Sequence, residues 1–176
     1  KGTNVYFIPA GGANEIGSLG YVDSARPLED LKSFTMSTTI WPTTPKKGRQ
    51  AIIAWGDQKR SGGVLGIKKD GLLFGEIGKT NINHSKPLNS RHWYTVWMAY
   101  DAAEQTLSIG CLPLSAKHTE PTTIIETINL DMPPDRMSSP LLFGAEQRDC
   151  ICSHFNGKIE HPRIHSFALG VENFPI

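Results

Sequence analysis

Hydrophobic and polar residues alternate with a period of two along most of this chain. In residues 34–41, Phe34, Met36 and Ile40 fall on one face and hydroxyl side chains fall between them. This is the period of a β-strand, because successive side chains of a strand point to opposite sides. Further short runs, rich in β-branched and aromatic residues and closed by Gly, Pro, Asn or Asp, predict additional strands. They cover residues 50–55, 64–68, 72–77, 93–100, 107–112, 122–129, 141–145 and 159–167, with two shorter runs near 5–8 and 19–22.

Turn-forming residues separate these runs. Asp70-Gly71 stands between two of them at hairpin spacing, and Asn156-Gly157 predicts another turn with positive φ. Only residues 27–33 and 101–105 have the composition of a helical turn. Many short strands without a long amphipathic helix predict an all-β fold, a two-sheet antiparallel jelly-roll sandwich. The length of 176 residues suits one domain, so we expect a single domain over residues 1–176.

The alternation also predicts which side chains form the core. Trp93 and Val96 fall on opposite faces of one run, so both can be buried only where both faces are covered. For the four tryptophans we favour core packing, with stacking on sugars as the alternative. The residues expected to be mostly buried are Phe34, Ile40, Ile53, Leu73, Trp93, Val96, Leu107, Ile109, Phe143, Ile159 and Ile164.

Charge and cysteine content narrow the classes of function. Lys and Arg number 18 against 17 Asp and Glu, a net charge of +1, which argues against nucleic acid and against a membrane surface as partners. No apolar run approaches the ~20 residues of a membrane-spanning helix. Three cysteines without a ladder of spacings favour a reducing compartment, so we expect a cytoplasmic location. Because the first residue is Lys, we expect the chain to be a piece of a longer one.

The candidate catalytic residues form no pair or triad along the sequence. Retaining glycosidases need two carboxylates about 5–5.5 Å apart, which acidic residues at alternate strand positions would supply. Glu76 stands alone, and Glu126 and Asp131 have the wrong spacing. No Gly-x-Ser-x-Gly elbow is present, and Cys111 lies in an apolar run. We therefore predict no catalytic and no cofactor-binding residue in this chain, and its ligand-binding residues stay unknown.

The histidines and cysteines give no complete metal site. On a strand, His161 and His165 would lie about 13 Å apart, too far to share one ion. Cys150, Cys152 and His154 would alternate on one strand face about 6.6 Å apart, but a fourth ligand is missing. We therefore predict that the domain folds without metal. The charged stretches 46–49 and 57–60 are interpreted as solvated turns and as the first candidates for an interface with a parent protein.

A series of short motifs resembles the laminin G-like jelly roll of the concanavalin A-like superfamily. The motifs occur in the same order as in that family, which implies its fold. In sequence order they are Phe34 to Pro42, Ile53 to Gly56, Asp70-Gly71, Pro87-Leu88, Trp93-Tyr94, Tyr100-Asp101, Phe143 to Ala145, Phe155 to Ile159, Pro162 to Ile164 and Ala168-Leu169.

Two longer segments resemble a narrower family. Residues 41–50 (WPTTPKKGRQ) and 152–159 (CSHFNGKI) are similar to the jelly-roll domain of the N,N-dimethylformamidase large subunit. The resemblance implies a parent enzyme that hydrolyses small N-substituted formamides with a mononuclear iron, and it places the iron site in a later part of that subunit. No iron-site residue matches a position here.

We therefore expect a non-catalytic accessory domain that serves packing, subunit assembly or shielding of a distant active site. Its expected partners are the remainder of the parent chain or other subunits. The alternative is a carbohydrate-binding module of the laminin G-like or lectin-like kind, with carbohydrate as its partner.

Overall fold

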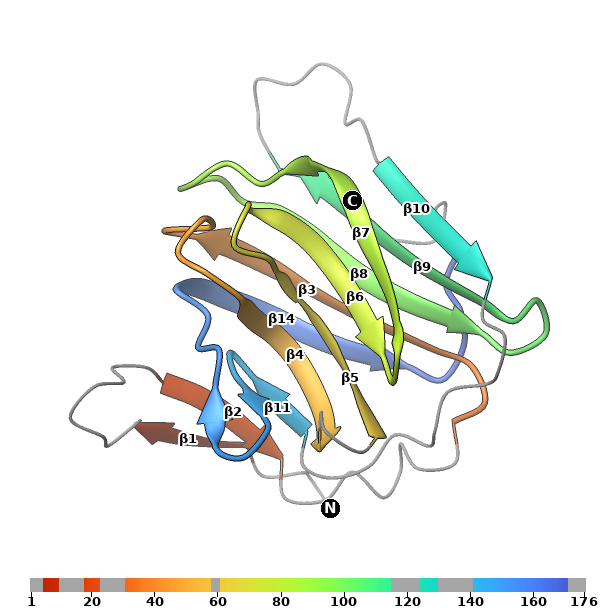
Figure 1. Ribbon diagram of the computed structural model, residues 1–176, viewed down its shortest axis with the longest axis horizontal. Coiled ribbons are helices and arrows are strands. Elements are labelled where there is room, and N and C mark those ends of the chain that lie inside the picture. The colour runs from red at the N-terminus through yellow and green to blue at the C-terminus, as the bar shows by residue number, and fades with distance from the viewer. Residues whose placement is uncertain are drawn as a thin grey trace.

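The strands of the protein form two stacked antiparallel sheets and a short hairpin (Figure 1). This computed structural model describes residues 5–9, 18–22, 31–57, 61–114, 124–129 and 141–170. One sheet has seven strands in the order β1-β2-β11-β4-β5-β6-β7, and the other has five in the order β10-β9-β8-β3-β14. The predicted all-β, two-sheet antiparallel sandwich is confirmed. Within the described ranges, no helix is long and apolar enough to cross a membrane.

The strand bounds follow the alternating runs closely. The seven-stranded sheet contains β1 (Val5–Pro9), β2 (Ser18–Val22), β4 (Gln50–Asp57), β5 (Ser61–Ile67), β6 (Leu72–Ile77), β7 (Thr80–Pro87) and β11 (Leu141–Phe143). The five-stranded sheet contains β3 (Phe34–Pro42), β8 (Tyr94–Asp101), β9 (Thr106–Pro113), β10 (Ile124–Asn129) and β14 (Gly157–His165). The hairpin consists of β12 (Glu146–Gln147) and β13 (Ile151–Cys152). The sequence pattern did not predict β7 or this hairpin.

The turn predictions have mixed outcomes. Gly71 has a φ of 87° between β5 and β6, which confirms the Asp70-Gly71 hairpin. The prediction of a turn with positive φ at Asn156-Gly157 is wrong. Gly157 has no positive φ, begins β14 and pairs with Pro42 of β3. Residues 101–105 form a turn between β8 and β9, in which Asp101 Oδ1 accepts a hydrogen bond from the Ala103 amide at 2.9 Å. Of residues 27–33, the first four lie outside the described residues.

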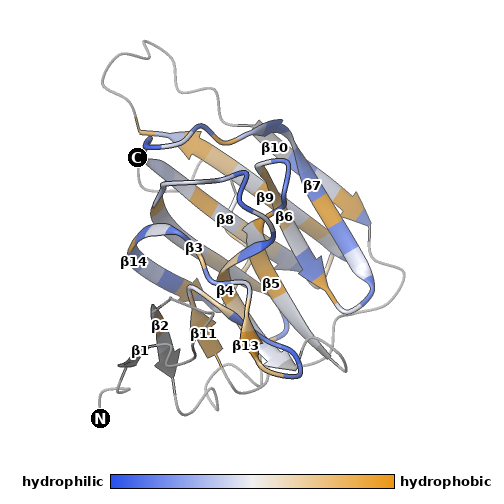
Figure 2. Ribbon diagram, turned by 60° about the vertical axis from the view of Figure 1, so that its left-hand side comes forward, coloured by the Kyte–Doolittle hydropathy of each residue, from blue (hydrophilic) through white to orange (hydrophobic). Residues whose placement is uncertain are grey.

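The core lies between the two sheets, where Figure 2 shows hydrophobic stretches along the central strands of both. Phe143, Ile159 and Ile164 are partly buried and pack against this core. Trp93 is also half-buried, but it precedes β8 and does not pack against this core cluster, so the prediction that it belongs to the core is wrong. The predicted core residues that are fully buried are Phe34, Ile40, Ile53, Leu73, Val96, Leu107 and Ile109.

Residues 166–170 cross the outer face of the five-stranded sheet. Thr35 Oγ1 donates to the Phe167 carbonyl at 2.9 Å and accepts from the Leu169 amide at 2.8 Å. Leu169 packs against Trp97 and Leu112, which are buried on this outer face. This segment therefore covers β8 on the side that faces away from the core.

Strand β14 is the last described strand of the five-stranded sheet, and its middle is irregular. Its pairing with β3 shifts register between Glu160 and Arg163. His161 lies in this bulge with a φ of 51°. Pro162 follows it and has no backbone N–H to donate. The strand therefore runs as two short pieces on either side of the bulge.

Candidate functional site

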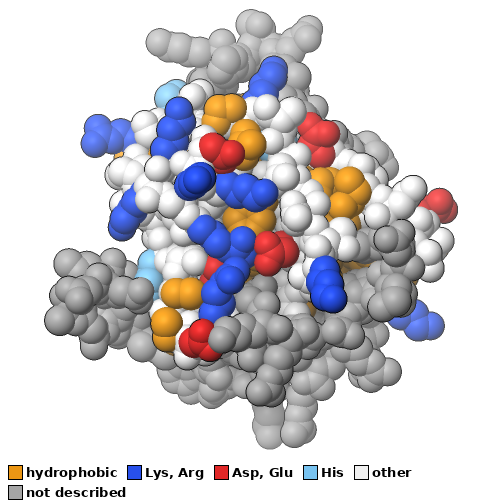
Figure 3. Space-filling model, viewed as in Figure 1, with side chains coloured by type: hydrophobic (Ala, Val, Ile, Leu, Met, Phe, Trp, Pro, Cys, Tyr) orange, Lys and Arg blue, Asp and Glu red, His pale blue; other side chains and the backbone are white. Residues whose placement is uncertain are grey.

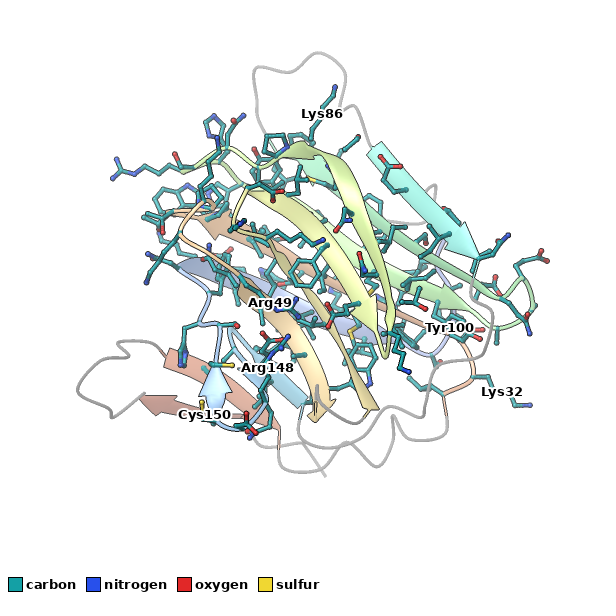
Figure 4. The ribbon with its side chains drawn as sticks, viewed as in Figure 1. Lys32, Arg49, Lys86, Tyr100, Arg148 and Cys150 are labelled. Carbon is teal, nitrogen blue, oxygen red and sulfur yellow. The ribbon has the colours of Figure 1, made fainter. Side chains whose placement is uncertain are left out.

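A charged network on the outer face of the seven-stranded sheet joins three distant parts of the chain (Figure 4). Arg49, which precedes β4, donates from Nε to Glu146 Oε1 at 2.8 Å and from Nη2 to Glu146 Oε2 at 3.0 Å. The same guanidinium donates to both oxygens of Glu76 on β6, at 3.1 and 3.3 Å. Ser153 Oγ donates to Glu146 Oε1 at 2.6 Å, and Arg148 Nε lies 3.2 Å from that oxygen. The Glu146 side chain is fully buried at the centre of this network.

A small apolar floor lies under Arg49. The guanidinium carbon is 4.4 Å from the centroid of the Phe74 ring, and the Lys68 ammonium is 5.9 Å from it. The ring lies over Gly66, where an added Cβ would come within 2.8 Å of a ring atom. Figure 3 shows Lys and Arg side chains gathered over the middle of this face. The buried residues of the floor are Ala51, Ala54, Val64 and Phe74.

The electrostatics of the network favour a structural role. Burial alone would raise the pKa of the Glu146 carboxyl, but hydrogen bonds from Arg49 and Ser153 and the charges of Arg49 and Arg148 lower its pKa below the ordinary value. Glu146 is therefore ionised at neutral pH and is not a general acid. Two arginines face two glutamates, including Glu76, so the charges cancel. The network holds β4, β6 and β12 together.

The loops beside this network are joined by a buried glutamine. Gln50 is 1% exposed, donates from Nε2 to the Thr44 carbonyl at 2.9 Å, and accepts from the Asn156 amide at 2.8 Å. The Thr43 amide also donates to the Asn156 carbonyl at 2.8 Å. The segments 41–50 and 152–159, which carry the dimethylformamidase resemblance, therefore pack against each other. Hydrogen bonds of Thr43, Gln50 and Asn156, which belong to these two segments, maintain the contact between the loops.

Two tryptophans lie in the interior and two at the surface. Trp55 and Trp97 are 1% and 2% exposed, as core packing predicts. For Trp41 and Trp93 that prediction is wrong, because both are only half-buried. The Lys158 ammonium lies 5.3 Å from the Trp41 ring centroid and 6.0 Å from that of Trp93. The end of the five-stranded sheet therefore presents two indoles and a cation to solvent.

The residues considered as metal ligands do not share one strand face. Cys150 is exposed in the turn of the β12–β13 hairpin, and Cys152 ends β13. Ser153 follows with a φ of 55°, which interrupts the strand before His154, so the predicted alternation of these three side chains is wrong. Among the described residues, no group of three or more His, Cys, Asp or Glu is placed to hold a metal ion. Folding without metal stays a prediction.

Cys111, His161 and His165 lie on strands outside this hairpin. Burial raises the pKa of the Cys111 thiol to about 12, so this side chain stays protonated at neutral pH. His161 occupies the bulge of β14, and the His165 ring packs edge-on against Phe167 at 5.7 Å between centroids. His161 therefore has a role in the backbone bulge, and His165 has a role in packing.

The prediction of solvated turns holds for only part of the first charged stretch. Lys46 and Lys47 are exposed, as expected of a solvated turn, but Arg49 belongs to the network with Glu76 and Glu146. Residues 58–60 of the second stretch lie outside the described residues. The two glutamates were missed because their strands are far apart in sequence, and a search at alternate positions cannot find them.

Comparison with curated proteins gives two related sequences, while no protein-family model matches the chain. The N,N-dimethylformamidase beta subunit of Paracoccus aminophilus is 28% identical over 165 residues, covering 80% of this chain and 21% of that protein. The protein of the same name from Alcaligenes sp is 25% identical over 176 residues, covering 87% and 23%. The chain thus spans about a fifth of the length of the curated relatives it matches.

Solved structures with the same architecture come from several kinds of protein. The Ruminococcus gnavus IT-sialidase CBM40 bound to alpha2,3 sialyllactose matches with a TM-score of 0.67 and 16% identity, over 84% of this chain and 83% of that one. The SAP-like pentraxin from Limulus polyphemus gives 0.63 and 14%, over 94% and 76%. The LG1-3 region of the laminin alpha2 chain gives 0.63 and 10%, over 86% and 31%. These likenesses show that the chain has the jelly-roll sandwich fold of laminin G and carbohydrate-binding domains.

Proposed function

We propose that this chain is a non-catalytic accessory domain of a subunit of an N,N-dimethylformamidase-like amidohydrolase. The observation that carries the proposal is the similarity to two dimethylformamidase beta subunits, which covers 80% and 87% of this chain but only 21% and 23% of theirs. Both relatives are named beta subunits, whereas the sequence resemblance pointed to the large subunit, and the catalytic iron would belong to the rest of such a subunit. The partners of this domain are then the remainder of that chain or other subunits.

The polar chemistry of the described residues supports an accessory role. Amide hydrolysis needs an activated water or nucleophile, a proton donor and a group that stabilises the oxyanion. Glu146 is an ionised carboxylate held by two arginines, and Cys111 is a buried thiol with a pKa of about 12. The first contributes to strand packing and the second to the core, so neither suits proton transfer or attack on an amide.

The test compares the purified chain with its full-length parent. Each is incubated with dimethylformamide, with and without ferrous or ferric iron, and formate is assayed. We expect formate from the parent and none from the chain alone. Sustained turnover by the chain, abolished by a single substitution within it, would overturn the accessory role. An inactive parent that still binds glycans would favour the alternative below.

Carbohydrate binding is the second candidate function. It is supported by the likeness to the CBM40 structure, which covers 84% of this chain and 83% of that one, and by the half-buried Trp41 and Trp93 at the surface. Indole rings offer flat apolar faces on which the C–H groups of sugars stack. A glycan array probed with the purified chain tests this candidate directly, and its result is independent of the formate assay.

A further inference from the structure

Four side chains form a row across one end of the five-stranded sheet, on its outer face. Lys158 pairs with Trp41 across β14 and β3. The last pair between β3 and β8 joins Ile40 to Tyr94, so Trp93 is the next residue beside Trp41. The Leu114 amide donates to the Trp93 carbonyl at 2.9 Å, which places Leu114 next in line. Strands lie about 4.8 Å apart, so the row is roughly 14 Å long.

The row faces away from the core. Ile40, Tyr94 and Ile159 each point inward and pack within or against the main core cluster. Their neighbours Trp41, Trp93 and Lys158 therefore point to the opposite side, because successive side chains of a strand alternate. The segment 166–170 covers this side of the sheet at Thr35 and Trp97, away from the row.

The size of the row suits a small ligand better than a protein. Leu114 is 41% exposed and the two indoles are half-buried, so the apolar surface of the row comes from parts of only three side chains. A standard protein–protein interface buries about 1,200–2,000 Å² in total. A row about 14 Å long is therefore better suited to a short oligosaccharide than to a protein.

The positive charge of Lys158 at one end of the row favours ligands that carry a negative charge. The ammonium of Lys158 lies within 6.0 Å of both indole centroids, so a sugar stacked on either ring comes close to it. Arg91, an exposed cation, donates its amide to the carbonyl of Pro42, the residue after Trp41, at 2.7 Å. Glu160, two residues beyond Lys158, is the acidic residue on the same strand. Two cations against one acid favour a ligand with negative charge.

We propose that Lys158, Trp41, Trp93 and Leu114 form a binding site for an acidic oligosaccharide of the uronate type. The pyranose rings stack on the two indoles, and a carboxylate lies against the Lys158 ammonium. The site goes beyond the accessory role and does not depend on it. It gives carbohydrate binding a location and a ligand class.

The experiment is a calorimetric titration of the purified chain with trigalacturonate and with its methyl ester, which has the same rings without the charge. We expect the wild type to prefer the acid by about fivefold, the factor for a single solvent-exposed charge pair. Trp41→Ala and Trp93→Ala should each weaken binding at least tenfold. Lys158→Met keeps the apolar stem and should bind acid and ester equally. Phe167→Ala, which removes a 53% exposed ring elsewhere on this side of the sheet, should bind like the wild type.

A second measurement does not rely on the folding of any variant. Because Trp55 and Trp97 are buried, acrylamide quenches mainly Trp41 and Trp93, so protection from quenching on adding trigalacturonate reports on these two indoles. The circular dichroism and melting temperature of each variant verify its fold.

Several results would overturn the proposal. These are no heat and no fluorescence change at millimolar trigalacturonate, equal affinity for acid and ester, or binding unchanged by the two tryptophan substitutions. A glycan that binds the array yet tolerates Trp41→Ala would keep carbohydrate binding but refute this site. Protection of both indoles in the full-length parent, without sugar binding, would identify the row as a protein interface instead.

Discussion

Replacing Glu146 by glutamine is expected to lower the free energy of unfolding by about 3 kcal/mol. The carboxylate is fully buried and accepts from Arg49 Nε and Nη2 and from Ser153 Oγ, with Arg148 beside it. Glutamine keeps the shape but removes the charge and turns one acceptor into a donor that faces cations. Removing one partner of a buried pair costs about 3–5 kcal/mol. Because Arg49 is 28% exposed and retains Glu76, we place the cost at the lower end.

The assay is urea denaturation followed by tryptophan fluorescence, with thermal unfolding as a second measure. For a domain of this size the loss corresponds to roughly 6–12 °C in melting temperature. Glu76→Gln is the matched control, because its carboxylate is 23% exposed and bonds the same guanidinium at 3.1 and 3.3 Å. It should cost less than about 1 kcal/mol. Equal costs for the two variants, or a cost below about 1 kcal/mol for Glu146→Gln, would refute the central role of Glu146.

The stability difference between the wild type and Glu146→Gln is expected to depend on pH. The pKa of Glu146 is lower in the folded than in the unfolded protein, so the unfolded state binds more protons as the pH falls. The stability that Glu146 contributes is complete above its unfolded pKa of about 4.3 and is lost as the pH drops through the folded pKa. The difference in unfolding free energy between wild type and Glu146→Gln should therefore shrink in acid. A constant difference would show that ionisation of this carboxyl is not the cause.

Three further outcomes are expected. Gly63→Ala should lower stability by about 1–3 kcal/mol in the urea assay, because the added Cβ would overlap the buried Trp55 ring, and an unchanged midpoint would contradict this packing. A strong chelator should leave the melting temperature unchanged, since we expect folding without metal, and a drop of several degrees would reveal a bound ion. A thiol reagent at neutral pH should modify exposed Cys150 in the native protein and reach Cys111, whose pKa is about 12, only on unfolding; rapid native labelling of Cys111 would refute its burial.

The strands that could be predicted from the sequence are those whose own residues alternate. β6 has the predicted bounds because Leu73 and Ile77 face the core. β7 was missed because Asn81 and Asn83 are exposed and its buried positions include His84, so its pattern is mostly polar. That strand is specified by pairing with β6, which is information outside its own sequence.

Neither the exposure of the tryptophans nor the charged network around Glu146 could be predicted from the sequence, and the reasons differ. Trp93 and Trp97 do share one face, as the alternation predicts, but Trp97 is buried under the crossing segment with Leu169, whereas Trp93 is half-buried. Arg49 meets Glu146 across 97 residues of sequence, and local spacing has no bearing on that distance. Sequence patterns predict which way a side chain points, whereas what covers it depends on chain segments that arrive from elsewhere.

The bulge in β14 affects whether this edge of the sheet can pair with a strand of another molecule. A straight strand at the edge of a sheet exposes a continuous row of N–H and C=O groups, which another chain can extend into a shared sheet. In β14, His161 at a φ of 51° and Pro162 interrupt that row, and the charged Lys158, Glu160 and Arg163 flank the interruption. An incoming strand could match only one short piece before losing register. This edge therefore resists intermolecular β-sheet formation and aggregation.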